Sequence, residues 1–284
     1  MGYRYSLAFL TVSELPPPRA VEVAARAGFD CVGLRLLPSG TDGPYPILTD
    51  RALQRATLAA LRDTGVTLAD IEIIRITPDF DVEGTLAFLE TGARLGATNI
   101  LTAGYDPDEN RMIDNYGAFC ELAQGHGMTA DLEFMPWTNV ATVGDAARIV
   151  AAVNHSAAGV LVDALHVQRS DSPFADIAAL QDEWIHYAQL CDAPGVFDQR
   201  YDALIATARE NRQMPGDGDF DFDALLTALP DDIVLSVEVP QLHRNPVVPA
   251  SKRAAEALTK AKRVGSSRSD LHASGPRVGH IVDE

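Results

Sequence analysis

Cysteine is scarce in this chain, which has only three in 284 residues: Cys31, Cys120 and Cys191. An odd number of cysteines cannot pair completely, and no two of these are closely spaced in the sequence. Cys31 and Cys191 lie inside apolar runs that are typical of strands. We therefore expect buried free thiols and not a reactive nucleophile.

Basic residues and long apolar runs are scarce as well. The 23 lysines and arginines are outnumbered by 40 aspartates and glutamates, which gives a net charge of −17. Nucleic acids and anionic membranes bind basic patches, so we expect neither as a partner. No apolar run is long enough to cross a bilayer, and the N-terminal Met-Gly-Tyr-Arg-Tyr lacks the three regions of a signal peptide. We expect a cytoplasmic protein that acts on a small molecule.

The rest of the composition suits one large α/β domain. The hydrophobic content of 46% can fill a large core, and the length is close to the roughly 250 residues of a common α/β barrel. Strand-like runs alternate with helix-like runs, as βα repeats require. We expect strands at 3–10, 29–36, 66–76, 98–103, 129–134, 159–162, 185–190 and 233–239. We expect helices at 18–27, 50–64, 82–95, 110–126, 143–152, 174–180, 201–211 and 250–262.

This alternation predicts a single (β/α)8 TIM barrel over residues 1–263, with no second domain. Glycines follow several of the expected helices, as at Gly28 and Gly65, where a helix commonly ends. Residues 264–284 form a polar tail rich in serine, glycine and charge, with little periodicity. We expect this tail to be loosely held or to cover a neighbouring part of the molecule.

Four of the expected strands end in a polar side chain that can bind a metal: Glu133, Asp163, Gln189 and Glu238. The carboxyl ends of parallel strands meet at one mouth of a barrel, where such enzymes keep their chemistry. Three carboxylates and an amide oxygen would form a hard site for a divalent cation. Alone, each has a simpler explanation, such as an arginine partner for Glu133 or a structural hydrogen bond for Gln189. Together they predict a metal site.

Other charged residues surround these positions in the sequence. His166 follows Asp163 by three residues and could act as an acid or base, or hold the ligand shell. Four arginines are candidates for binding an anionic substrate, the alternative being charge balance among the carboxylates of the mouth. They are Arg35, Arg75, Arg200 and Arg212.

Six stretches of the chain match the pattern of one family. They are Gly28-Phe29-Asp30-Cys31-Val32-Gly33-Leu34-Arg35, Asp131-Leu132-Glu133, Asp163-Ala164-Leu165-His166, Gln189-Leu190-Cys191-Asp192-Ala193, Met214-Pro215-Gly216-Asp217-Gly218 and Val237-Glu238. In this order they resemble the xylose isomerase-like TIM barrels, the sugar phosphate isomerase/epimerase superfamily, over about residues 3–262. The resemblance implies one divalent ion (Mg²⁺, Mn²⁺ or Co²⁺) held by Glu133, Asp163, Gln189 and Glu238. It also implies a homodimer.

Two positions depart from the family pattern. Gly33 stands where members commonly have glutamate, so a role at the end of the second strand is lost or passes to Arg35. Gln189 stands where most isomerases and epimerases have histidine. A glutamine there resembles the bacterial 3-dehydroshikimate dehydratase branch, in which a histidine follows the metal-binding aspartate by three residues, as His166 does here.

The resemblance implies a metal-dependent isomerase or epimerase that acts on a small hydroxy-carbonyl compound through a metal-stabilised enediolate. Glu133 and Glu238 would transfer protons on the two faces of the substrate. The alternative is a metal-dependent lyase of the 3-dehydroshikimate dehydratase or keto-sugar eliminating type, with His166 as the proton-transfer group. A barrel that binds a ligand without catalysis is a further alternative. DNA repair is excluded, because it needs a histidine-rich multi-metal site and a basic surface.

Overall fold

The computed structural model describes residues 3–37 and 45–273 of the chain, with side chains up to residue 266. Within these residues, no helix is both long and apolar enough to span a membrane. Cys31, Cys120 and Cys191 are free and buried, which confirms the expectation of buried free thiols.

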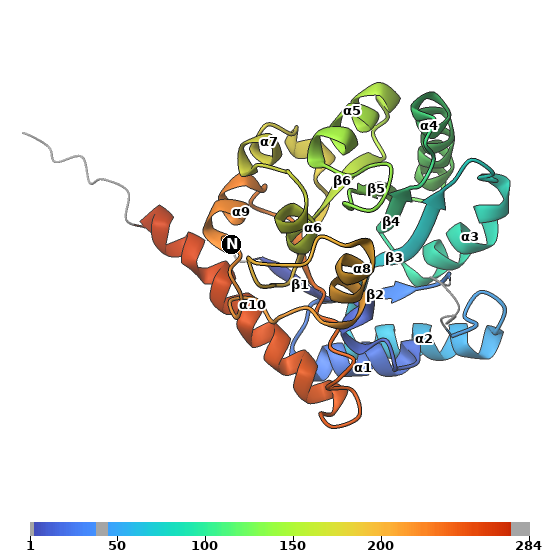
Figure 1. Ribbon diagram of the computed structural model, residues 1–284. Coiled ribbons are helices and arrows are strands. Elements are labelled where there is room, and N and C mark those ends of the chain that lie inside the picture. The colour runs from blue at the N-terminus through green and yellow to red at the C-terminus, as the bar shows by residue number, and fades with distance from the viewer. Residues whose placement is uncertain (1–2, 38–44, 274–284) are drawn as a thin grey trace, which may run out of the picture.

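The strands of the described residues form one closed parallel barrel in chain order, with β8 returning to pair with β1. This confirms the predicted (β/α)8 fold. Figure 1 shows the strands in the middle of the molecule and most of the helices around them. The strands are β1 (Arg4–Leu7), β2 (Cys31–Arg35), β3 (Thr67–Ile76), β4 (Asn99–Gly104), β5 (Thr129–Glu133), β6 (Ala158–Asp163), β7 (Tyr187–Leu190) and β8 (Val234–Val237).

Each expected helix is present, and two further helices occur that the sequence analysis missed, α6 and α9. The helices are α1 (Pro17–Ala27), α2 (Arg51–Thr64), α3 (Leu86–Leu95), α4 (Glu109–Gly125), α5 (Val143–Val153), α6 (Ala164–Arg169), α7 (Phe174–Ala178), α8 (Tyr201–Glu210), α9 (Phe222–Ala228) and α10 (Ala250–Ala273). Both missed helices are shorter than eight residues, so they give no clear helical period in the sequence. Side-chain caps begin them: the Asp163 carboxylate accepts from the Leu165 amide, and Asp221 accepts from the Ala224 amide.

The last helix is longer than expected. It was predicted to end at residue 262, but α10 continues to Ala273, through the first ten residues of the predicted polar tail. Gly265 looks like a break in the sequence, yet it is a packing position, because a Cβ there would lie 2.3 Å from the Tyr5 hydroxyl oxygen. The remainder of the predicted tail, 274–284, lies outside the described residues.

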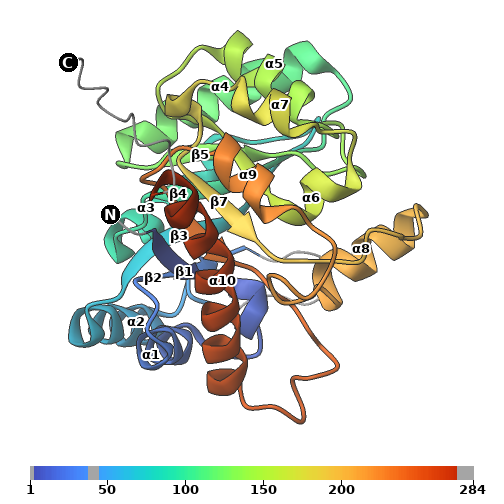
Figure 2. The same ribbon diagram turned by 90° about the vertical axis from the view of Figure 1, so that its left-hand side faces the viewer.

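The main apolar core lies between the barrel and the surrounding helices, and a smaller apolar cluster is separate from it. The smaller cluster contains Ile73 of β3, Leu101 of β4, Met135 just after β5, and Tyr187 of β7. Figure 2 shows α10 running along the outside of the barrel beside α1 and α9, whereas α8 stands out from one end. The barrel end that carries α8 is where the chemistry-bearing side chains gather.

Candidate metal centre

The four polar residues predicted at strand ends all lie at the carboxyl end of the barrel. Glu133 and Asp163 are the last residues of β5 and β6, Gln189 is in β7, and Glu238 follows β8. Strand register aligns Asp163 with Gln189, and Gln189 with Ser236 two residues before Glu238. None of the four is more than 4% exposed. The closed barrel thus brings together residues that are far apart in the sequence.

Two of these side chains, Glu133 and Asp163, form a cluster with His166 that has metal-ligand spacing. One ligand atom each of Glu133, Asp163 and His166 lie within 4.8 Å of one another, and all three residues are buried. The Gln189 amide has two placements beside them. With its nitrogen turned toward the carboxylates, it donates to Asp163 Oδ2 at 2.8 Å and to Glu133 Oε1 at 3.3 Å. With its oxygen there, its nitrogen donates to Glu238 Oε1 at 3.4 Å.

The second placement of Gln189 is the one that a cation would favour. In this placement the amide oxygen of Gln189 lies beside two carboxylate oxygens, and no hydrogen bond joins the three acceptors. Three acceptors this close repel one another unless a cation lies between them. The donor set therefore fits a hard divalent metal, as the sequence predicts. The structure adds His166 to the cluster, a residue that the sequence analysis assigned to proton transfer or to support of the ligands.

Arg212 lies in the middle of the same carboxylates. Its guanidinium donates to Asp163 Oδ2 at 2.6 Å, lies 2.8 Å from Glu238 Oε2, and is anchored by Nε to the Ala208 carbonyl at 2.9 Å. Only 3% of the residue is exposed. The sequence made Arg212 a candidate for binding a substrate anion, with charge balance among the mouth carboxylates as the alternative. In the structure it contacts two of those carboxylates. It orients two candidate ligands and offsets part of their charge.

The carboxylates of this cluster bring an excess of negative charge into a buried environment. Burial first, and then Asp163 and Glu238, raise the pKa of Glu133 well above its usual range, with Arg212 opposing them. Burial, Glu72 and Asp163 likewise raise the pKa of Glu238 to about 7. Burial also disfavours the charged form of Asp163, yet Arg212 and other partners outweigh it and lower that pKa. A divalent cation would relieve this mutual repulsion.

His166 is a neutral imidazole in this setting. Burial lowers its pKa to about 4, although Asp163 opposes the shift. Its Nε2 lies 3.6 Å from Glu133 Oε1, and the Trp137 ring packs edge-on against it with centroids 5.0 Å apart. Nδ1 of His166 and Nε1 of Trp137 are buried without a hydrogen-bond partner among the described residues. Both nitrogens are therefore available to a ligand.

A pocket opens above the cluster and has about 50 Å³ of free space. One wall is apolar and includes Ile73, Leu101, Met135 and Trp137. Such a wall excludes water from the carbon skeleton of a small ligand. The pocket is lined by Leu10, Arg35, Glu72, Ile73, Arg75, Leu101, Tyr105, Glu133, Met135, Trp137, His166, Ala208, Arg209, Arg212 and Glu238.

The pocket includes three of the four arginines proposed to bind substrate. Arg35 lies 3.2 Å from Glu72 and stacks 4.8 Å from the centroid of the Phe9 ring, and Arg75 hydrogen-bonds Tyr105. Arg200 is exposed, pairs with Asp198 at 2.6 Å, and does not line the pocket.

Arg209 lines the pocket but was missed by the sequence analysis. It is one of several charged residues on α8, and only the rotation of that helix in the fold decides which of them faces the mouth.

The structure also explains the glycine that departs from the family pattern. A Cβ at Gly33 would lie 2.6 Å from Oδ2 and 2.7 Å from Oδ1 of Asp70, its register partner on β3. The Asp70 carboxyl group thus occupies the space beside Gly33. Burial first, and then Glu72 and other acids, raise the pKa of Asp70 well above its usual range.

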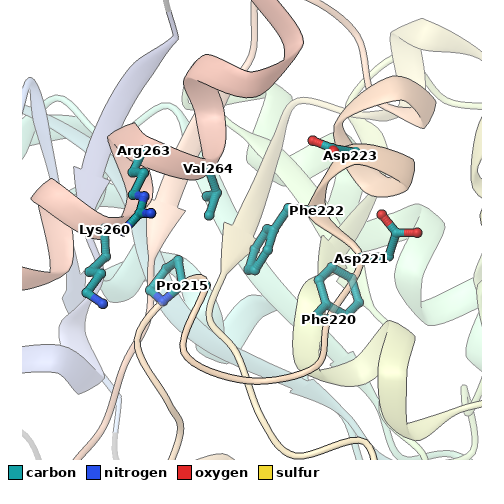
Figure 3. A pocket seen from close by; sticks show the side chains of 9 residues that line it. Pro215, Phe220, Asp221, Phe222, Asp223, Lys260, Arg263 and Val264 are labelled. Carbon is teal, nitrogen blue, oxygen red and sulfur yellow. The ribbon is translucent and has the colours of Figure 1, made fainter.

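A larger hollow of about 400 Å³ lies on the outside of the barrel, between α9 and α10. Figure 3 shows Pro215, Phe222 and Val264 in its walls, with Lys260 and Arg263 reaching over from α10. Lys260 forms an ion pair with Asp217. This hollow contains none of the predicted site residues.

The geometry defines a class of protein: a (β/α)8 barrel with a buried, oxygen-rich, metal-competent centre at its carboxyl mouth. Residues 21–263 match the family model described as xylose isomerase-like TIM barrel, and the chain belongs to that family. The predicted family and fold are thus confirmed. No curated protein sequence matches the chain.

Solved structures with the same fold are distant in sequence. A fusion of a xylose isomerase-like TIM barrel with 4-hydroxyphenylpyruvate dioxygenase has a TM-score of 0.82 and 20% identity, covering 98% of this chain and 46% of its own. The chain therefore spans about half the length of that protein. A D-allulose 3-epimerase from Methylomonas sp. has a TM-score of 0.68 and 16% identity, covering 93% of this chain and 98% of its own.

The probable 3-DHS dehydratase AsbF of petrobactin synthesis from Bacillus anthracis has a TM-score of 0.71 and 17% identity, covering 91% of this chain and 98% of its own. At these identities the likeness of all three structures shows the fold alone. Solved structures with this fold thus include proteins named for two reactions, an epimerisation and a dehydration.

Proposed function

We propose that this protein is a divalent-metal-dependent isomerase or epimerase of a small hydroxy-carbonyl compound. The observation that supports this most strongly is the position of two buried glutamates. Glu133 reaches the pocket from the end of β5 and Glu238 from the end of β8, three strands further around the barrel. A substrate between them would present a different face to each carboxylate, which two-face proton transfer requires.

The metal would be held by Glu133, Asp163, Gln189 and Glu238, with His166 beside them. When bound, a divalent ion such as Mg²⁺, Mn²⁺ or Co²⁺ polarises a carbonyl and acidifies the neighbouring C–H bond. The ligand types do not discriminate among these ions. Arg212 would hold the Asp163 and Glu238 carboxylates in place from the side of the α8 segment.

The protein's own residues supply the proton transfers. One glutamate removes the proton from the carbon beside the carbonyl, which leaves an enediolate. Return of a proton to the opposite face by the other glutamate gives an epimer, and return to the adjacent carbon gives an isomer. The apolar wall formed by Ile73, Leu101, Met135 and Trp137 keeps water away from the reacting carbons.

A lyase is the second candidate, and Gln189 and His166 favour it. His166 is neutral, buried and close to Glu133, so it can accept the proton from the carbon beside the carbonyl. The same proton can then pass to a departing β-hydroxyl, which leaves as water while a carbon–carbon double bond forms. This chemistry would place the protein with the 3-dehydroshikimate type of dehydratase. We also propose a cytoplasmic location, from the sequence, and a homodimer, which the family resemblance implies.

The two functions differ in where the proton goes. Manganese-loaded protein would be incubated in D₂O with ketoses, an inosose and 3-dehydroshikimate, with Glu133→Gln as the inactive control. Deuterium beside the carbonyl of a recovered sugar would support the isomerase or epimerase. Ultraviolet absorbance of an aromatic product from 3-dehydroshikimate would support the lyase instead. Failure of both signals in protein that retains one metal per chain would refute both candidates.

A further inference from the structure

Positively charged side chains gather on one side of the pocket, although the chain as a whole is strongly acidic. Arg35 is at the end of β2, Arg75 is in β3, and Arg209 is on α8, yet all three line the same pocket. They lie close enough for their charges to interact: after burial, which is the larger cause, Arg35 and Arg209 lower the pKa of Arg75, whereas Tyr105 raises it. Bringing like charges together costs free energy, so a compensating anion is expected there.

The charges that line the pocket do not balance once a metal is present. Four arginines face three glutamates in the lining, and Asp163 beneath adds one more negative charge. Arg35 pairs with Glu72, and Arg212 pairs with Glu238 and Asp163. A divalent ion brings two further positive charges to these carboxylates. The loaded pocket would therefore carry a net positive charge, which an uncharged sugar does not need.

Arg209 is the most informative of these arginines. It is exposed on α8, the helix that stands out from the barrel end in Figure 2, and no ion pair of Arg209 is found among the described residues. The segment that leads to α8 is anchored at the rim: the Arg169 guanidinium stacks 3.9 Å from the centroid of the Phe197 ring and donates to the Pro194 carbonyl at 3.0 Å. Because the segment before α8 is anchored at the rim, α8 holds Arg209 in place at the pocket.

We propose that Arg75 and Arg209 bind an oxyanion of the substrate, a carboxylate or a phosphate, at the β3 side of the pocket. This inference rests on the proposed function, because it takes the same pocket as the active site and narrows the substrate to an anionic hydroxy-carbonyl compound. The reacting carbons lie over Glu133 and Glu238, and the anionic group lies toward β3 and α8. Guanidinium groups suit both anions, since their planar forks match the oxygens of each.

The test measures binding and not turnover. Manganese-loaded protein is titrated calorimetrically with two matched pairs of probes: 3-dehydroshikimate against an uncharged inosose, and D-fructose 6-phosphate against D-fructose. We expect at least one charged probe to bind at least 10-fold more tightly than its uncharged partner. We expect Arg209→Gln to weaken binding of that charged probe by about 10- to 100-fold, since hydrogen bonds to charged groups are this strong. Arg209→Lys should retain part of the affinity, and binding of the uncharged probes should change less than twofold.

The control variant is Arg62→Gln, which removes the same charge from an exposed pair with Asp63 on α2. It should bind every probe as the natural protein does. The inference is overturned if neither charged probe binds better than its uncharged partner, or if Arg209→Gln binds the preferred charged probe as tightly as the unchanged protein does. Preference for the carboxylate pair or the phosphate pair identifies which anion is used. Tight anion binding with no turnover would refute the proposed function but not the anion site.

Discussion

Removal of Arg212 should lower the stability of the metal-free protein much more than that of the metal-loaded protein. The guanidinium is almost wholly buried and contacts Asp163 at 2.6 Å and Glu238 at 2.8 Å. Replacing it by methionine keeps an apolar stem of similar length but leaves two buried carboxylates without their cation. Loss of one partner of a buried ion pair costs about 3–5 kcal/mol. For a chain of 284 residues, this lowers the melting temperature by roughly 5–8 °C.

A bound divalent ion should reverse much of this loss, because it neutralises the same two carboxylates. Differential scanning calorimetry of Arg212→Met with and without Mn²⁺ measures the difference directly. The metal should also bind the variant more tightly than the natural protein, since a positive charge beside the site has been removed. Isothermal titration with Mn²⁺ provides the second measurement.

Two variants serve as controls for Arg212→Met. Arg212→Lys keeps the charge but loses the fork that contacts both carboxylates, so its loss should be smaller. Arg148→Met removes an exposed ion pair with Glu109 on the surface, which contributes only about 0–1 kcal/mol. If Arg212→Met loses the same stability with and without metal, or no longer binds Mn²⁺, then the carboxylates serve Arg212 alone and the proposed metal centre is wrong.

Three further predictions concern single residues. Gly33→Ala should lower the free energy of unfolding in urea by about 1–3 kcal/mol, because its Cβ meets the Asp70 carboxyl group. Adding Asp70→Ala to this variant should restore most of the loss, and purely additive effects of the two changes would contradict this explanation. Glu238, whose folded pKa is raised from 4.5 to about 7, should stabilise the metal-free protein fully below pH 4.5 and progressively less as the pH rises through 7. Glu238→Gln should flatten this fall of roughly 3 kcal/mol in thermal melts between pH 5 and 8. His166→Asn should lower kcat about 10²- to 10⁴-fold while one metal stays bound per chain. If the variant instead loses the metal, His166 is a metal ligand and not a proton-transfer group.

The alternation of strands and helices could be predicted from the sequence because each element carries its own signal. β6 is an apolar run that ends at Asp163, and helices such as α1 end at a glycine with a left-handed φ of 91° at Gly28. Where the local signal is weak, the prediction was wrong or incomplete. α6 and α9 are too short to show a helical period, and α10 passes through Gly265 because that glycine packs against Tyr5.

The sequence by itself determined the type of each candidate ligand and its place at the end of a strand, since both are local properties. Only the closed barrel decided which of those side chains meet: it set Asp163 beside Gln189, and it put Arg212 on the carboxylates of Asp163 and Glu238. It also left Arg200 on the surface while turning Arg209 into the pocket. The physical reason is that strand register and helix rotation are set by packing over the whole domain, whereas the sequence pattern of a segment depends only on that segment's own structure.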